Sequence, residues 1–83
     1  MSPEQIKALR VSLDLTQAEF GLALGVSRLT MSQYEIGFRR PGSTVLILLR
    51  VLDSRSKAKG LEFVKLLVSH AEVARPNRKP GRA

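Results

Sequence analysis

The stretch from Gln17 to Gly37, QAEFGLALGVSRLTMSQYEIG, constrains the fold more than any other part of the chain. Its first half carries apolar residues suited to a short helix and ends at Gly25, which adopts a positive φ angle at little cost. Ser27 follows as a good cap for a second helix that begins at Arg28. A short helix, a glycine turn and a second helix with a polar outer face together predict a helix-turn-helix motif.

The second helix of this motif is expected from about residue 28 to residue 36. Met31 and Tyr34 are three positions apart and can face a core, which leaves the polar residues for the outside. Arginine can pair with guanine, glutamine with adenine, and a leucine side chain or a threonine methyl group can contact the thymine methyl group. An ordinary solvated face is the alternative. The residues predicted to contact DNA bases are Arg28, Leu29, Thr30, Ser32 and Gln33.

Two helix-start patterns precede the glycine turn: one predicts an additional N-terminal helix, and the other marks the start of the first motif helix. Ser2 with Gln5 forms one capping-box pattern, and Thr16 with Glu19 forms a second that starts a helix at Gln17. Asp14 and Leu15 are expected to turn the chain between these two helices.

The second half of the chain predicts two further helices. Ser43 can cap a fourth helix, which is apolar almost all round and is therefore expected to be buried on more than one side. A polar linker is predicted over residues 53–60, followed by a fifth helix with a wide apolar stripe. The fold class is thus all-α with five helices. One domain is expected over residues 1–74, and residues 75–83, with two prolines and four basic residues, are expected to form a disordered tail.

Composition narrows the functional classes. The chain has 83 residues, no cysteine and one histidine, His70, so no metal site, cofactor site or catalytic constellation is predicted. There is no apolar run long enough to cross a bilayer and no signal-peptide pattern, so a cytoplasmic protein with no membrane partner is expected. The net charge of +7 favours a polyanionic partner. Arg39 and Arg40 follow the predicted recognition helix, where phosphate contact is the first expectation.

The chain resembles the lambda-repressor-like family of helix-turn-helix proteins, also called Cro/C1 or Xre. The matching features lie within residues 4–53. They are Thr16-Gln17 at the start of the first motif helix, the small residue Gly21, the turn at Gly25, the buried Met31 and the closing pair Tyr34-Glu35. The continuation GFRRPGSTVLILLRVLD is more similar still to the DNA-binding domains of antitoxins from type II toxin–antitoxin pairs. Asp14 stands where the family usually has glycine, and aspartate tolerates that conformation.

This resemblance implies a sequence-specific transcriptional regulator of double-stranded DNA that acts as a homodimer on a palindromic operator. It implies phosphate contacts by Thr16, Gln17 and Ser27, and an ion pair between Arg10 and Glu35. An autoregulating repressor of antitoxin or phage-repressor type is expected, with a cognate toxin as a possible partner. A restriction–modification controller would have much the same sequence.

The apolar stripe of the fifth helix exceeds what so short a chain can cover, so part of it is expected to contact a second subunit. The residues predicted at this dimer interface are Leu61, Phe63, Val64, Leu67 and Val68. Two other functional classes remain open at this stage. One is a protein-interaction module in which DNA binding is secondary, and the other is an RNA-binding or nucleoid-like protein that uses charge alone.

Overall fold

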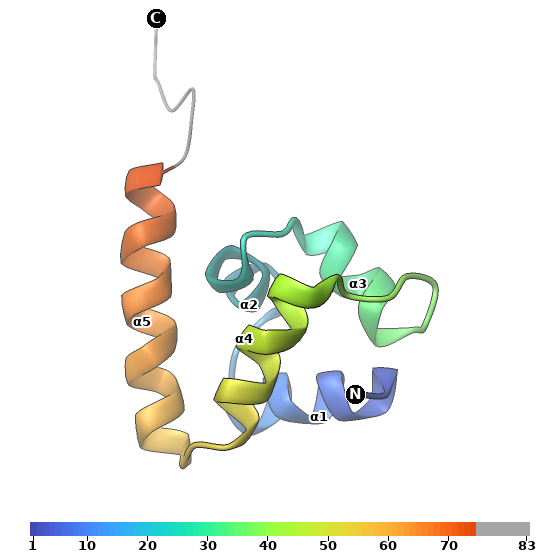
Figure 1. Ribbon diagram of the computed structural model, residues 1–83, viewed down its shortest axis with the longest axis horizontal. Helices are drawn as coiled ribbons and strands as arrows, with labels where there is room; N and C mark the ends of the chain where they lie inside the picture. The colour runs from blue at the N-terminus through green and yellow to red at the C-terminus, as the bar shows by residue number, and fades with distance from the viewer. Residues whose placement is uncertain (75–83) are drawn as a thin grey trace, which may run out of the picture.

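The computed structural model describes residues 1–74, which form five α-helices and no strand (Figure 1). The helices are α1 (Pro3–Ser12), α2 (Gln17–Leu24), α3 (Arg28–Glu35), α4 (Ser43–Asp53) and α5 (Lys57–Ala74). The predicted all-α, five-helix, lambda-repressor-like architecture is confirmed. The predicted tail at residues 75–83 lies outside the described residues.

The first two helices begin at the residues that the capping patterns predict. The Ser2 hydroxyl oxygen accepts a hydrogen bond from the backbone N–H of Gln5 at 3.1 Å, and the Gln5 side chain accepts one from the backbone of Ser2 at 2.8 Å. Thr16 and Glu19 make the same reciprocal pair, at 3.1 Å and 2.8 Å. Each box satisfies backbone donors that a helix start otherwise leaves without partners.

Two residues with positive φ angles set the turns on either side of α2. Asp14 has a φ angle of 59° between α1 and α2, and Gly25 has a φ angle of 77° at the end of α2. Gly21 is required for a steric reason rather than for its φ angle. A Cβ atom there would lie 2.8 Å from the carbonyl oxygen of Val26 and 3.2 Å from the Cγ atom of Met31. Its missing side chain therefore lets the turn and α3 lie close against α2.

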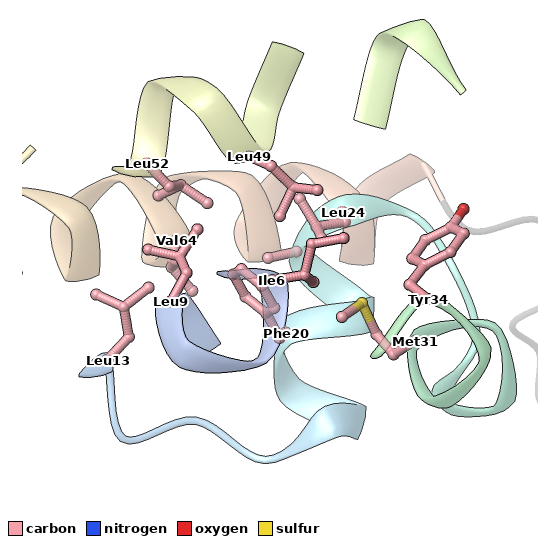
Figure 2. Packing of buried hydrophobic residues seen from close by; sticks show 11 residues of the cluster. Ile6, Leu9, Leu13, Phe20, Leu24, Met31, Tyr34, Leu49, Leu52 and Val64 are labelled. Carbon is pink, nitrogen blue, oxygen red and sulfur yellow. The ribbon is translucent and has the colours of Figure 1, made fainter. Parts of the chain in front are cut away.

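The hydrophobic core lies where α1, α2 and α3 meet α4 and α5 (Figure 2). Its largest side chains are completely or almost completely buried: Phe20, Ile6, Met31, Leu49 and Leu52. Helix α2 packs against both α3 and α5, while α1 packs against α3 and α4. The two helices of the helix-turn-helix therefore pack against α1 and α5, and α4 packs in turn against both of these helices.

Helix α4 differs from its prediction in two respects. Its N-cap is Gly42, which has no side chain to accept a hydrogen bond, and Ser43 is the first helical residue rather than the cap. Only Leu49 and Leu52 are buried on this helix, and Ile47 is exposed. The expectation that α4 is buried on several sides is therefore too strong, because α4 is covered by neighbours mainly on one face.

The predicted linker over residues 53–60 is also too long. Asp53 is the last residue of α4, and Lys57–Gly60 form the first turn of α5. Gly60 is buried, and a Cβ atom there would lie 3.2 Å from a methyl carbon of Leu13. The glycine that suggests a linker in the sequence therefore permits close packing of α5 against the end of α1.

Figure 1 shows α5 as a long helix standing on the side of the molecule opposite the loop that joins α3 to α4. The described part of the chain contains no helix long and apolar enough to span a membrane.

Candidate nucleic-acid interface

The first turn of α3 is fixed by Ser27, which lies just before it. The hydroxyl oxygen of Ser27 accepts a hydrogen bond from the backbone N–H of Thr30 at 3.1 Å and donates one to the Thr30 hydroxyl at 3.0 Å. The side chains of Arg28 and Leu29 project from this turn and are exposed, whereas Thr30 is half-buried. Of these three predicted base-contacting residues, Arg28 and Leu29 are thus the more accessible.

The inner face of α3 anchors the helix and so determines which side chains point outward. Met31 and Tyr34 are buried in the core, as predicted. At 3.6 residues per turn, Arg28, Ser32 and Gln33 lie within about 140° of one another on the opposite side. Ser32 and Gln33 are half-buried. The predicted base-contacting residues therefore share one outer face of α3, and Thr30 lies at its edge.

A buried polar cluster joins α1, α2 and α3 behind this face. Arg10 donates to Glu35 through Nε at 2.6 Å and through Nη2 at 3.0 Å, and its Nη1 atom donates to the carbonyl oxygen of Leu15 at 2.8 Å. The amide nitrogen of Gln17 donates to Glu35 Oε1 at 3.2 Å. The predicted Arg10–Glu35 pair is therefore present in the structure, and Gln17 is an additional member.

Burial and hydrogen bonding shift the pKa of the Glu35 carboxyl group in opposite directions. Burial alone raises the pKa of this carboxyl group, but the hydrogen bonds from Arg10 and Gln17 and the charges of Arg10 and Lys7 outweigh burial. The pKa of Glu35 consequently lies below its ordinary value. The hydrogen bond to Glu35 raises the pKa of Arg10, with burial opposing it. Both groups therefore stay charged near neutral pH.

The bond between Gln17 and Glu35 bears on the predicted phosphate contact. One amide N–H of Gln17 is used within the protein, so a phosphate would meet the second amide N–H or the backbone N–H in the first turn of α2. Thr16 and Ser27 are exposed, but each uses its hydroxyl oxygen to cap a helix. Phosphate contacts by all three residues stay predictions. The Gln17–Glu35 bond could not be predicted from the sequence, because the two residues meet only in the tertiary structure.

The loop after α3 is folded back onto the end of that helix. Gly37 has a φ angle of 80°, and the backbone N–H groups of Phe38 and Arg39 both donate to the carbonyl oxygen of Gln33, at 2.9 Å and 3.3 Å. Arg39 and Arg40 are exposed in this loop, which follows α3. Phosphate contacts by these two residues stay a prediction.

Two exposed apolar residues in this region were not singled out from the sequence. Ile36 follows the last residue of α3, and Phe38 has 76% of its surface exposed. Their position in the sequence just after Tyr34, the last buried apolar residue of α3, was the available signal. Both are exposed and lie outside the core.

The predicted dimer residues of α5 are divided between the core and the surface. Val64 is buried within the subunit, and Leu61, Phe63, Leu67 and Val68 are half-buried against the core. The prediction that Val64 lies at an interface stays a prediction, although its 5% exposure leaves little of this side chain for a second subunit. Leu66, which the prediction omitted, is 52% exposed. A groove of about 350 Å³ runs between α2 and α5, lined in part by Leu15, Leu22 and Val68.

Comparison with known proteins agrees with this geometry. The sequence profile of the family described as "Helix-turn-helix" matches residues 6–52, from α1 to the end of α4. The chain is 32% identical over 76 residues to a protein of Methanospirillum hungatei JF-1 named "Putative HTH-type transcriptional regulatory protein". That match covers 92% of this chain but only 24% of the relative, so the chain spans about a quarter of the relative's length. No solved structure gives a significant match. On the profile match and the fold, the chain belongs to the helix-turn-helix family.

Proposed function

We propose that the protein is a transcriptional regulator that binds double-stranded DNA through α3. The observation that carries this proposal is the outer face of α3, where Arg28, Leu29, Ser32 and Gln33 lie together because Met31 and Tyr34 anchor the opposite side. In this motif the second helix enters the major groove, and its N-terminal and outward side chains reach the base edges. Membership of the helix-turn-helix family supports the same function.

Within the groove, each side chain has a chemical role. Arg28 can donate two hydrogen bonds to one guanine, and Gln33 can pair with the N6 and N7 atoms of adenine. Leu29 can contact a thymine methyl group, and Ser32 and Thr30 can bond either a base or a phosphate.

Affinity comes mainly from the phosphate backbone. The net charge of +7 and the exposed Arg39 and Arg40 provide attraction that does not depend on sequence. The capped starts of α2 at Thr16 and of α3 at Ser27, together with Gln17, support phosphate contacts, because a helix N-terminus offers backbone N–H groups to an anion.

The finer role we infer is repression by a homodimer on a palindromic operator. Two copies related by two-fold symmetry would place their α3 helices about 34 Å apart, which is one turn of DNA. An autoregulating repressor of antitoxin or phage-repressor type fits a small basic domain of this kind. The relative from Methanospirillum, named as a regulator, supports the regulatory class but not the choice among these types.

Selection of binding sites from a random DNA pool tests the proposal. We expect one enriched sequence with two-fold symmetry, bound at least a thousand times (about 10³) more tightly than random DNA at physiological salt. Equal affinity for selected and random DNA would instead show binding by charge alone. If the protein bound no DNA even at low salt, DNA binding would be excluded as its function.

A second candidate function is a protein-interaction module. The groove between α2 and α5 and the exposed Leu66 favour it, because both provide apolar surface away from α3. Tight binding to a co-purified protein, with no DNA shift at low salt, would select this alternative.

A further inference from the structure

A hollow of about 540 Å³ lies beneath the loop that joins α3 to α4. Its walls come from the first turns of α1, the end of α3, the loop itself and α4. Pro3, Ile6 and Leu46 supply apolar surface, while Tyr34, Arg39 and Arg40 supply polar groups. The residues that line the hollow include no aspartate and no glutamate.

The hydroxyl group of Tyr34 has no hydrogen-bond partner within the described residues. The residue is only 6% exposed, and its ring packs among the core side chains. Figure 2 shows its hydroxyl pointing away from Met31 and the rest of the labelled cluster. No protein atom within residues 1–74 accepts from or donates to this hydroxyl. A buried polar group without a partner is costly, and such a group in a hollow is a donor available to a ligand.

The charge of the hollow determines the kind of ligand that fits. Neither Arg39 nor Arg40 forms an ion pair with any described carboxylate, so both guanidinium groups are available. Two positive charges without an acidic neighbour attract an anion, and arginine binds carboxylate or phosphate in a bidentate manner. The apolar side chains of Ile6 and Leu46 can cover a hydrocarbon or aromatic body.

We propose that this hollow binds a small organic anion. Its carboxylate or phosphate group accepts hydrogen bonds from the Tyr34 hydroxyl and from Arg39 and Arg40, and its apolar part lies against Ile6 and Leu46. The same anionic chemistry can come from two sources, a free metabolite or a phosphate of bound DNA. A free ligand would withdraw Arg39 and Arg40 from DNA phosphates, so it would weaken binding to all sequences alike. This regulatory consequence, but not the site itself, rests on the proposed function.

The direct test titrates phenyl phosphate, and separately inorganic phosphate, into the isotope-labelled full chain without DNA and follows the backbone signals by NMR. We expect phenyl phosphate to shift the backbone signals of Tyr34, of Leu46 and of the residues that flank Pro3 in the sequence. It should also bind more tightly than inorganic phosphate, because its ring can contact the apolar side chains of the hollow. Tyr34→Phe should weaken binding roughly tenfold, since it removes one hydrogen bond to a charged group. Its melting temperature should not fall, because the hydroxyl has no protein partner.

A charge-matched pair of variants separates a site from general attraction. Arg40→Gln and Arg50→Gln each remove one positive charge, but Arg50 is exposed on α4 and does not line the hollow. Loss of phenyl phosphate binding in the first variant alone supports the site. Equal loss in both variants, binding unaffected by Tyr34→Phe, or no binding at millimolar probe would overturn it.

The two sources of the anion are distinguished with DNA. If Tyr34→Phe weakens DNA binding when no small molecule is present, the site holds a DNA phosphate. If DNA binding is unchanged and only the competition by phenyl phosphate is lost, the site takes a free anion. The second result supports the small organic anion, and the first overturns it in favour of a DNA phosphate. If wild-type protein binds the probe but no DNA, the proposed function fails while the anion site stands.

Discussion

The Nε atom of Arg10 lies 2.6 Å from Oε2 of Glu35 and so joins α1 to the last residue of α3. Only 13% of the Arg10 side chain and 3% of the Glu35 side chain are exposed. An ion pair this buried contributes only modestly to folding stability as a whole, because both groups lose hydration. The loss of one partner is costly, however, because it leaves the other charge buried without a partner. The pair thereby fixes the end of α3 relative to α1.

The replacement Glu35→Ala should therefore lower stability strongly. We expect a loss of about 3–5 kcal/mol from the stranded Arg10 and the unpaired Gln17. In a domain of this size that loss corresponds to a fall of roughly 12 °C or more in Tm. Thermal unfolding followed by circular dichroism measures it.

The exposed pair of Lys57 and Asp14 provides the control for this experiment. Its Nζ–Oδ2 distance is also 2.6 Å, but the two side chains are 55% and 74% exposed. Lys57→Ala should cost no more than about 1 kcal/mol, because water screens the pair. Equal effects of the two replacements would show that burial does not govern the Arg10–Glu35 pair.

The lowered pKa of Glu35 also predicts a pH dependence. A carboxyl group whose pKa is lower in the folded than in the unfolded protein contributes stability above its unfolded pKa. This contribution is lost as the pH falls through the folded value, which lies on the acid side of the ordinary glutamate range. The stability difference between wild type and Glu35→Gln should therefore shrink as the pH is lowered from neutral into that range. Urea unfolding across the pH series is the measurement, and a constant difference would contradict the assignment.

The surface of α5 leads to a prediction about oligomeric state. Leu66 is exposed next to the half-buried Leu67 and is the most exposed large apolar side chain between residues 57 and 72 of α5. We expect sedimentation at micromolar concentration to find a dimer, and Leu66→Glu to convert it to a monomer by placing a charge in an apolar contact. Val11→Glu is the matched control, because Val11 on α1 is equally exposed. A monomeric wild type, or equal disruption by both variants, would exclude this interface.

The features that sequence predicted best are those decided by neighbours along the chain. The two capping boxes, at Ser2 with Gln5 and at Thr16 with Glu19, depend on residues three positions apart. The positive φ angle of Gly25 and the burial of Met31 follow from local turn chemistry and helical spacing. The outer face of α3 was predictable for the same reason.

The features that sequence missed depend on contacts between distant segments. Gly60 suggests a linker, yet it is helical and buried because α5 packs closely against Leu13. Val64 belongs to the core rather than to an outer stripe, since α5 turns that residue inward. The Gln17–Glu35 bond and the unpartnered Tyr34 hydroxyl also arise only once the helices are assembled. Hydrophobic spacing identifies a helix face but not which neighbour covers it.

The outer face of α3 gives the most specific prediction about recognition. Arg28 is exposed in the first turn and Gln33 lies on the same outer side, so both can reach base edges in the major groove. Replacing either residue by alanine should cost about 1–3 kcal/mol on the best operator and relax the preference at one base pair in each half-site. Neither side chain is part of the core, so the Tm of each variant should stay close to that of wild type.

Arg39 and Arg40 supply the comparison that makes this prediction specific. If they hold phosphates, each alanine replacement should weaken all DNA sequences alike and reduce the salt slope of binding by about 0.9. The base preference should then stay unchanged, in contrast to Arg28→Ala and Gln33→Ala. Affinities measured on a panel of operators with single base changes, at several salt concentrations, separate the two classes. Recognition would have to lie elsewhere if Arg28→Ala and Gln33→Ala kept the wild-type preference at every position, because no other side chain on the outer face of α3 can form two hydrogen bonds with one base.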